Sequence, residues 1–205
     1  LVCISRPRRF GKSFAAKMLC AYYDHSCDSH ELFDRYQISG AVDYEKHMNQ
    51  YHVINLDMSA IVSEAVKNKA QISDIPMQLS ESIRQELVAF CPQISRQDNM
   101  LDCFRECVEI TGREFVFVID EWDAVIREAK GDTEAVRTYL SLLREWFKNS
   151  NFTPKVVAAA YMTGILPIKK DGSQSAISDF KEFTILNPGP FTEYTGFTEI
   201  GRAHV

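Results

Sequence analysis

A short segment near the amino terminus combines basic side chains, one glycine and a hydroxyl in an order that suits phosphate binding. Residues 5–13 read Ser-Arg-Pro-Arg-Arg-Phe-Gly-Lys-Ser. The closing Gly11, Lys12 and Ser13 match the end of the phosphate-loop pattern G-x-x-x-x-G-K-[ST], whereas Arg6 stands where that pattern has its first glycine. In such a loop the lysine reaches the β- and γ-phosphates and the hydroxyl ligates Mg²⁺. The alternative is a strand-to-helix turn that carries basic residues, and Pro7 partly compensates for the missing glycine by restricting the backbone.

A second segment places two adjacent carboxylates at the end of the most apolar run in the chain. Phe115–Ile119 has the composition of a buried strand, and Asp120 and Glu121 follow it directly. This is the Walker B arrangement, in which the first carboxylate holds Mg²⁺ and the second polarises the attacking water. The alternative is an ordinary buried strand before a helix with an acidic first turn. Two half-motifs in the expected order, each at the end of a strand, favour nucleotide binding.

The elements that must position these residues alternate between strands and helices. The expected strands are Leu1–Ser5, His52–Asp57, Phe115–Ile119, Lys155–Thr163 and Phe183–Leu186. The expected helices start at Ser13 (with Phe14, Met18, Leu19 and Tyr22 on one face), cover Ile75–Phe90, run from a cap at Asp98 or Asn99 to Gly112, and pass through Val136–Phe147. The polar stretch from Asp24 to about Gln50 is expected to be loop with short helices. Strands separated by helices predict an α/β fold with a parallel sheet covered on both faces.

Composition limits the class of protein. The chain has 205 residues, 45% of them hydrophobic and 25% charged, which fits one globular domain. A net charge of −5 gives no indication of nucleic-acid or anionic-lipid binding. No apolar run has membrane-spanning length, and no cleavable signal is visible. The six cysteines form no C-x-x-C pair, so we expect reduced thiols in a cytoplasmic protein.

Three segments resemble the AAA-ATPase-like family of bacterial and archaeal proteins. They are Ser5–Ser13, Ile119–Asp123 and Tyr161–Ile165. Members are P-loop ATPases related to the signal-transduction (STAND) group and often carry a nuclease-like domain of the PD-(D/E)xK type further on. In that family Arg-Pro-Arg-Arg-Phe-Gly-Lys-Ser is the usual loop, so Arg6 is a family trait. The resemblance implies a three-layer P-loop sandwich with strand order 5-1-4-3-2, in which the strand of Tyr161 lies between those of Ile4 and Ile119.

The resemblance and the motifs together give a set of candidate site residues. Thr163 is implied to lie beside the γ-phosphate as a polar sensor, although a hydroxyl capping a strand end is an equal alternative. Asp123 could cap the next helix or assist at the metal, and the cap is favoured. Asp57 ends a strand beside the Walker B strand and has no assigned role. The predicted catalytic residues are Lys12, Glu121 and Thr163; the metal ligands are Ser13 and Asp120; the nucleotide-binding residues are Pro7, Arg8, Arg9, Phe10, Gly11, Lys12, Ser13 and Phe14.

The ends of the sequence carry a further expectation. Residues 1–198 are expected to form one P-loop ATPase domain cut at both ends, because the chain begins with Leu1 inside an apolar run. Residues 199–205 read Glu-Ile-Gly-Arg-Ala-His-Val, as in-frame translation of a common sequencing adapter does. We therefore interpret them as an adapter or cloning scar.

The function that these observations predict is Mg²⁺-dependent binding and hydrolysis of ATP by a module that drives or gates an effector domain in the missing carboxyl-terminal part. ATP rather than GTP is implied by the resemblance. An alternative is a nucleotide-gated switch with little turnover that controls a nuclease-like or partner domain. Nothing in these residues carries nuclease chemistry, so the nuclease rests on analogy with the family. The sequence leaves the oligomeric state open and indicates no nucleic-acid or membrane partner.

Overall fold

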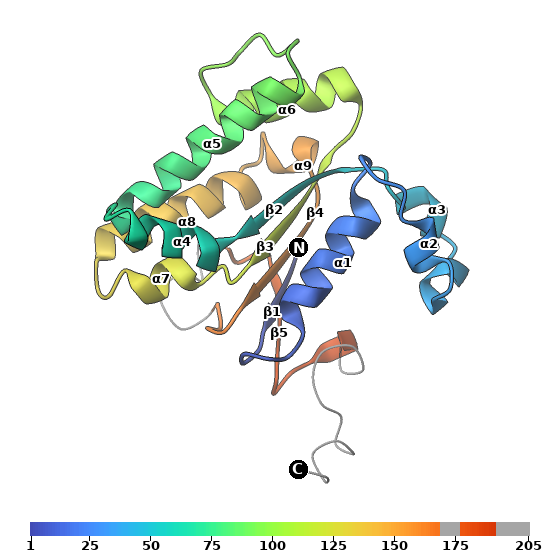
Figure 1. Ribbon diagram of the computed structural model, residues 1–205, viewed down its shortest axis with the longest axis horizontal. Coiled ribbons are helices and arrows are strands. Elements are labelled where there is room, and N and C mark those ends of the chain that lie inside the picture. The colour runs from blue at the N-terminus through green and yellow to red at the C-terminus, as the bar shows by residue number, and fades with distance from the viewer. Residues whose placement is uncertain (169–176, 192–205) are drawn as a thin grey trace.

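Five strands form one parallel sheet with helices against both faces (Figure 1). The computed structural model describes residues 1–168 and 177–191. The strands are β1 (Val2–Ser5), β2 (His52–Asp57), β3 (Phe115–Asp120), β4 (Val157–Gly164) and β5 (Lys181–Thr184). The predicted α/β class and the parallel sheet are confirmed.

The sheet order brings three strand ends together. It runs β2-β3-β4-β1-β5, which reads β5-β1-β4-β3-β2 from the other edge. The strand of Tyr161 thus lies between those of Ile4 and Ile119, because Ile4 pairs with Thr163 and Ile119 with Met162. Since all these strands are parallel, the carboxyl ends of β1, β3 and β4 share one edge of the sheet. Ligands of open α/β sheets bind at that edge.

The helices form two layers of unequal size. They are α1 (Lys12–Tyr23), α2 (His30–Phe33), α3 (Tyr44–His47), α4 (Met58–Lys67), α5 (Ile75–Phe90), α6 (Met100–Thr111), α7 (Ala124–Glu128), α8 (Thr133–Phe147) and α9 (Thr153–Val156), with short 3-10 turns at Gln37–Gly40, Ile72–Asp74 and Gly189–Phe191. In Figure 1, α1 lies on one side of the sheet, whereas α4 to α8 lie on the other. Within the described ranges, every helix is too short or too polar to cross a bilayer.

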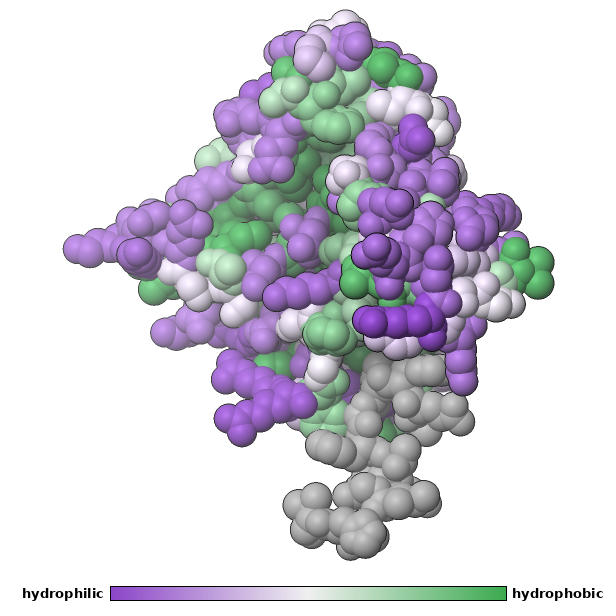
Figure 2. All heavy atoms as spheres, turned by 45° about the vertical axis from the view of Figure 1, so that its right-hand side comes forward, coloured by the Kyte–Doolittle hydropathy of each residue, from purple (hydrophilic) through white to green (hydrophobic). Residues whose placement is uncertain are grey.

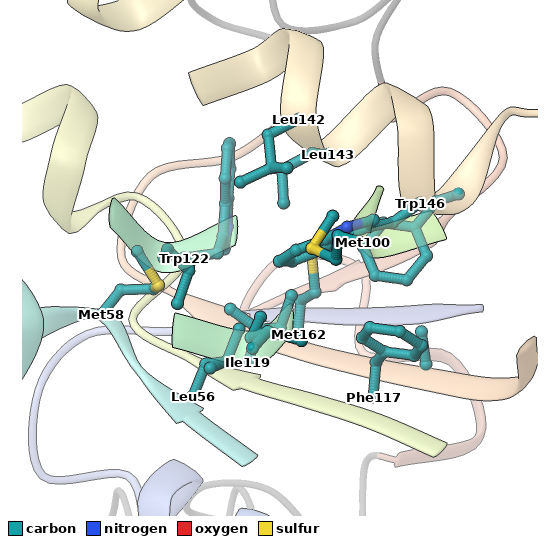
Figure 3. Packing of buried hydrophobic residues seen from close by; sticks show 14 of the residues in the cluster. Leu56, Met58, Met100, Phe117, Ile119, Trp122, Leu142, Leu143, Trp146 and Met162 are labelled. Atoms are coloured by element: carbon teal, nitrogen blue, oxygen red, sulfur yellow. The ribbon is translucent and has the colours of Figure 1, made fainter. Parts of the chain in front are cut away.

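Alternation along β3 explains why helices are needed on both faces. All six residues of β3 are buried. Phe117 and Ile119 belong to the large cluster on the α5, α6 and α8 side, whereas Val116 and Val118 pack with Ala16 of α1. Figure 3 shows the large cluster, in which Phe117 and Trp146 lie near one another, Leu142 and Leu143 approach from α8, and Trp122 points toward Leu142 from the segment after β3.

Capping residues fix the ends of the helices behind the sheet. The Asn99 side chain accepts hydrogen bonds from the backbone N–H groups of Leu101 and Asp102, at 2.8 and 3.3 Å. Gly112 ends α6 in a left-handed conformation, with φ of 70°. The prediction of a helix between these two residues is confirmed, with Asn99 rather than Asp98 as the cap.

Only part of the predicted face of α1 is buried: Leu19 packs beside Ala16 against the sheet, whereas Phe14 and Met18 do not. Phe14 and Met18 are 70% and 38% exposed, and the helix turns Ala16 toward the sheet instead. The loop before α1 fixes the orientation of the helix, and the small Ala16 side chain lets the helix approach β3 closely. Tyr22 is buried as predicted, in a separate cluster with Phe33 and Tyr44.

Several element boundaries also differ from the prediction. Lys155 belongs to the short helix α9, so β4 starts only at Val157. β5 covers residues 181–184 and ends before Leu186. A turn follows the strand, in which the Thr184 N–H donates to the Asn187 carbonyl at 3.0 Å. Helix α4 has no counterpart in the prediction. The expected scar at 199–205 lies outside the described residues.

Candidate functional site

The loop between β1 and α1 has the backbone shape that phosphate binding requires. Gly11 lies at the N-cap of α1 with φ of 74°, and Arg9 also has positive φ, at 69°. A Cβ built on Gly11 would meet no atom within 4 Å, so glycine is needed there for its backbone conformation rather than for space. The loop thus leads directly into a helix amino terminus, where backbone N–H groups and the helix dipole favour an anion.

Lys12 is the first residue of α1, and its side chain turns back into this loop. Its ammonium donates to the carbonyl oxygens of Arg6 and Pro7 at 3.0 and 2.8 Å, and the residue is only 7% exposed. Burial lowers the pKa of Lys12 below its ordinary value, and the nearby carboxylates, led by that of Asp120, oppose that shift. The ammonium therefore lies between the loop backbone and the acidic ends of the neighbouring strands.

Asp120 and Thr163 join the ends of β3 and β4. The Thr163 hydroxyl donates to Asp120 Oδ1. The Glu121 N–H contacts the same two side chains, at 3.1 Å from Asp120 Oδ1 and 3.2 Å from Thr163 Oγ1. The Trp122 N–H donates to the Thr163 carbonyl at 2.8 Å, so the chain after β3 is bound closely to the end of β4.

The close packing of these two strand ends requires a glycine. A Cβ on Gly164 would lie 2.5 Å from Trp122 Nε1 and 3.0 Å from Asp123 Oδ1. Gly164 also accepts the N–H of Arg6 at 3.0 Å, which connects the phosphate loop to β4. The three strand ends are therefore one connected structure.

Arg127 links the two carboxylates that follow Asp120. Its guanidinium Nη2 lies 2.6 Å from Glu121 Oε2, and Nη1 lies 2.7 Å from Asp123 Oδ2. Burial disfavours the charge of Arg127, but the hydrogen bonds and charges of Asp123 and Glu121 outweigh burial and raise the pKa of Arg127. The guanidinium is therefore a permanent positive charge beside Glu121 and Asp123.

Asp123 does not act as the predicted helix cap. It occupies the N-cap position of α7 but makes no capping hydrogen bond. Its Oδ2 instead accepts from the backbone N–H groups of Ile165 and Leu166, at 3.2 and 2.9 Å. The loop after β4 and Arg127 both engage Oδ2 of this fully buried carboxylate. Asp57, which had no assigned role, is a cap: it accepts from the Ala60 N–H at 3.0 Å at the start of α4.

Most of the predicted site residues gather at the shared edge of the sheet. Asp120, Glu121 and Thr163 are connected through the contacts above, and the Arg6–Gly164 hydrogen bond joins the loop that holds Lys12 to β4. Ser13 follows Lys12 in the first turn of α1. Arg8, Arg9 and Phe14 are exposed around this group, so which of them touches a ligand stays a prediction. Arg127 was missed in the sequence, although its spacing of four residues from Asp123 on a helix is a known ion-pair signal.

The oxygen donors at this edge suit Mg²⁺. Mg²⁺ in nucleotide sites is held by one or two protein oxygens, waters and phosphate oxygens. Asp120 uses Oδ1 for both of its internal hydrogen bonds, which leaves Oδ2 for a ligand, and the Ser13 hydroxyl is exposed. Among the described residues there is no group of three or more His, Cys, Asp or Glu side chains that could form a metal cage. The residues therefore fit a shared metal–phosphate site rather than a protein-only metal site.

The fold and the site define a class. A five-stranded parallel sheet between helical layers, with a glycine-lysine-serine loop and acidic residues at adjacent strand ends, is consistent with a P-loop-like α/β protein. Comparison with protein families then gives one match, to the family described as predicted AAA-ATPase, over residues 1–173. The chain belongs to this AAA-ATPase-like family, which suggests nucleotide binding. Neither the curated proteins nor the solved structures gave a significant match.

Proposed function

We propose that this chain binds and hydrolyses ATP with Mg²⁺, and that the module drives or gates an attached effector domain. One observation supports the proposal above all: the loop that holds the Lys12 ammonium and the strand end that carries Asp120 and Glu121 lie at the same carboxyl edge of the parallel sheet. Lys12 would hold the β- and γ-phosphates with the loop N–H groups. Asp120 and Ser13 would hold Mg²⁺, which when bound neutralises phosphate charge.

The remaining roles follow from the same arrangement. The Glu121 carboxylate would accept a hydrogen bond from the attacking water and so orient it toward the γ-phosphate. The Thr163 hydroxyl, which donates to Asp120, would keep that carboxylate in one orientation and lie close enough to sense the phosphate. No bond to the nucleotide base is assigned, so the preference for ATP rests on the family.

Two substitutions test the proposal. Lys12→Ala removes the buried ammonium and should weaken ATP affinity at least about 100-fold in a calorimetric titration, because a charged contact with phosphate is lost. Glu121→Gln keeps the size of the side chain and should lower kcat about 10²–10³-fold while the ATP Kd changes less than about threefold. Burst and steady-state measurements on the unaltered protein would separate turnover from a switch that binds one ATP and stalls.

Matched controls are present on α1 and α7. Lys17→Ala removes an exposed lysine from α1, and Glu128→Gln neutralises an exposed glutamate of α7. Both should leave ATP affinity and turnover within about twofold. Unchanged ATP affinity in Lys12→Ala would remove the loop from nucleotide binding, and unchanged turnover in Glu121→Gln would remove Glu121 from catalysis.

A further inference from the structure

The main chain of Glu121 is held by hydrogen bonds through both its N–H and its carbonyl group. Its φ is 51°, an uncommon conformation for a residue other than glycine. The N–H is held by Asp120 and Thr163, and the carbonyl accepts from the Ala124 N–H at 2.9 Å. The direction of the Glu121 Cα–Cβ bond is therefore set by the ends of β3 and β4. Only the side-chain torsions are left to decide where the carboxylate lies.

The ion pair with Arg127 restrains these side-chain torsions. Its Nη2 donates to Glu121 Oε2 at 2.6 Å, a short charge-assisted hydrogen bond. The contact engages Oε2, so the second oxygen, Oε1, can accept a hydrogen bond from water. The Glu121 side chain is 22% exposed, which leaves it room to meet a reactant. A carboxylate that is held through one oxygen can orient a water molecule by accepting its hydrogen bond at the other oxygen.

Arg127 is in turn anchored from the protein interior. Asp123 is fully buried; its Oδ2 accepts from the N–H groups of Ile165 and Leu166 and forms an ion pair with Arg127 Nη1 at 2.7 Å. This carboxylate connects α7 to the loop that follows β4. Arg127 therefore has a fixed position relative to the sheet edge on which Thr163 and Asp120 lie, and the guanidinium fork fits two carboxylates at once, which a lysine ammonium does less well.

We infer that Arg127 is a positioning residue that holds the Glu121 carboxylate for the attacking water and keeps it from pairing with Lys12. The inference rests on the proposed function. Lys12 is a second cation at this edge of the sheet, and its ammonium donates to the Arg6 and Pro7 carbonyls. With Arg127 in place, Glu121 has its own cation and Lys12 stays free for phosphate. Without Arg127, the Glu121 carboxylate would lose its ion pair, and electrostatic attraction would draw it toward the Lys12 ammonium.

Two substitutions separate the shape of the guanidinium from its charge. Arg127→Lys keeps the positive charge but loses the fork, and should lower kcat about 10-fold with an ATP Kd within about threefold of the unaltered protein. Arg127→Gln loses both and should lower kcat about 100-fold at saturating ATP, the scale expected for a misplaced catalytic group. Arg137→Lys and Arg137→Gln are the controls, since Arg137 pairs with Glu134 at 2.7 Å on an exposed face, and should leave kcat within about twofold.

Repeating the substitutions in Glu121→Gln shows whether Arg127 acts through Glu121. In single-turnover hydrolysis of γ-labelled ATP, Arg127→Lys and Arg127→Gln should slow the Glu121→Gln protein less than about twofold, because the group they position is already gone. A second readout needs no nucleotide. In the nucleotide-free protein, Arg127→Gln should lower the melting temperature by less in the Glu121→Gln background than in the unaltered protein, because one of the two ion pairs of Arg127 is already absent there.

The outcomes distinguish the inference from the function on which it rests. Hydrolysis by Arg127→Lys and Arg127→Gln at the rate of the unaltered protein overturns the inference and leaves the ATPase proposal intact. A second contrary result is that the Arg127 substitutions lower the rate, or the melting temperature, equally in the unaltered and the Glu121→Gln proteins. That result shows that Arg127 acts independently of Glu121, and it also overturns the inference. If the unaltered protein neither binds nor hydrolyses ATP, the proposed function fails and the role of Arg127 falls with it.

Discussion

Two residues other than glycine adopt left-handed backbone conformations at the candidate site, Arg9 with φ of 69° and Glu121 with φ of 51°. Such conformations cost a residue with a Cβ about 1–2 kcal/mol and persist where the surroundings impose them. At Glu121 two hydrogen bonds to its N–H impose the conformation. At Arg9 the side chain is exposed, and the loop closing around the Lys12 ammonium imposes it.

The strain at Arg9 gives a prediction for a neighbouring pair of substitutions. Arg9→Gly should raise the free energy of unfolding by about 0.5–1 kcal/mol, because glycine accepts positive φ and the gain exceeds its entropic cost. Arg8→Gly is the matched control: it removes the same charge next to it, but Arg8 has no positive φ, so glycine there should lower the stability by about 0.5–1 kcal/mol. Urea denaturation of both variants measures the difference. Equal effects at the two positions would show that the loop is not strained at Arg9.

Among the elements, α6 depends on one buried carboxylate. Glu106 accepts hydrogen bonds from the Ser95 N–H at 2.6 Å and from Arg96 Nε at 2.7 Å, which bind the connection between α5 and α6 to the helix. The hydrogen bond from the Ser95 N–H, followed by that from Arg96, lowers the pKa of Glu106 to about 2. The carboxylate therefore stabilises the folded protein fully above its unfolded pKa of about 4.3.

Because the folded pKa is lowered, this contribution decreases as the pH falls from about 4.3 through about 2. Glu106→Gln should be less stable than the unaltered protein at pH 7, and the difference should shrink at pH 3. Glu109→Gln, on the exposed side of the same helix, should show no such dependence. Urea unfolding at the two pH values measures it. A stability difference that is the same at pH 3 and pH 7 would mean that Glu106 acts through packing and not through its charge.

The elements that the sequence predicted well are those whose boundaries depend on local chemistry. The bounds of β2 and α5 agree with the prediction, because each has a continuous apolar pattern between polar ends. Helix α4 was missed because Asp57 ends β2 and caps α4 at once, with no linker to mark the change. The face of α1 was only partly right, because helical spacing alone does not show which side meets the sheet. At the site, motifs located Lys12 and Asp120. The position of Arg127 depends on Asp123, whose carboxylate is bound by the distant loop after β4, and no local pattern contains that contact.

At the scale of the whole molecule, the two halves of the chain meet through β1. Although it starts at Val2, β1 lies between β4 and β5, where Ile4 pairs with Thr163 and Phe183. The phosphate loop follows β1 directly, and the acidic strand ends reach it only through β4. Sheet pairing across such a sequence separation makes the site a property of the complete fold, since neither half contains both motifs.

This arrangement predicts one cooperative unfolding transition that β1 controls. Ile4 is fully buried, so Ile4→Ala should lower the free energy of unfolding by about 2–5 kcal/mol. The only tryptophans, Trp122 and Trp146, are both buried on the α8 side of the sheet and report on the other half of the chain. In Ile4→Ala, tryptophan fluorescence and far-ultraviolet circular dichroism should shift together to lower denaturant, as expected of a single cooperative unit. Val42→Ala, which shortens a fully exposed side chain, is the control and should shift neither. Separate transitions for the two probes would show that the helices on the α8 side fold without the strand that carries the phosphate loop.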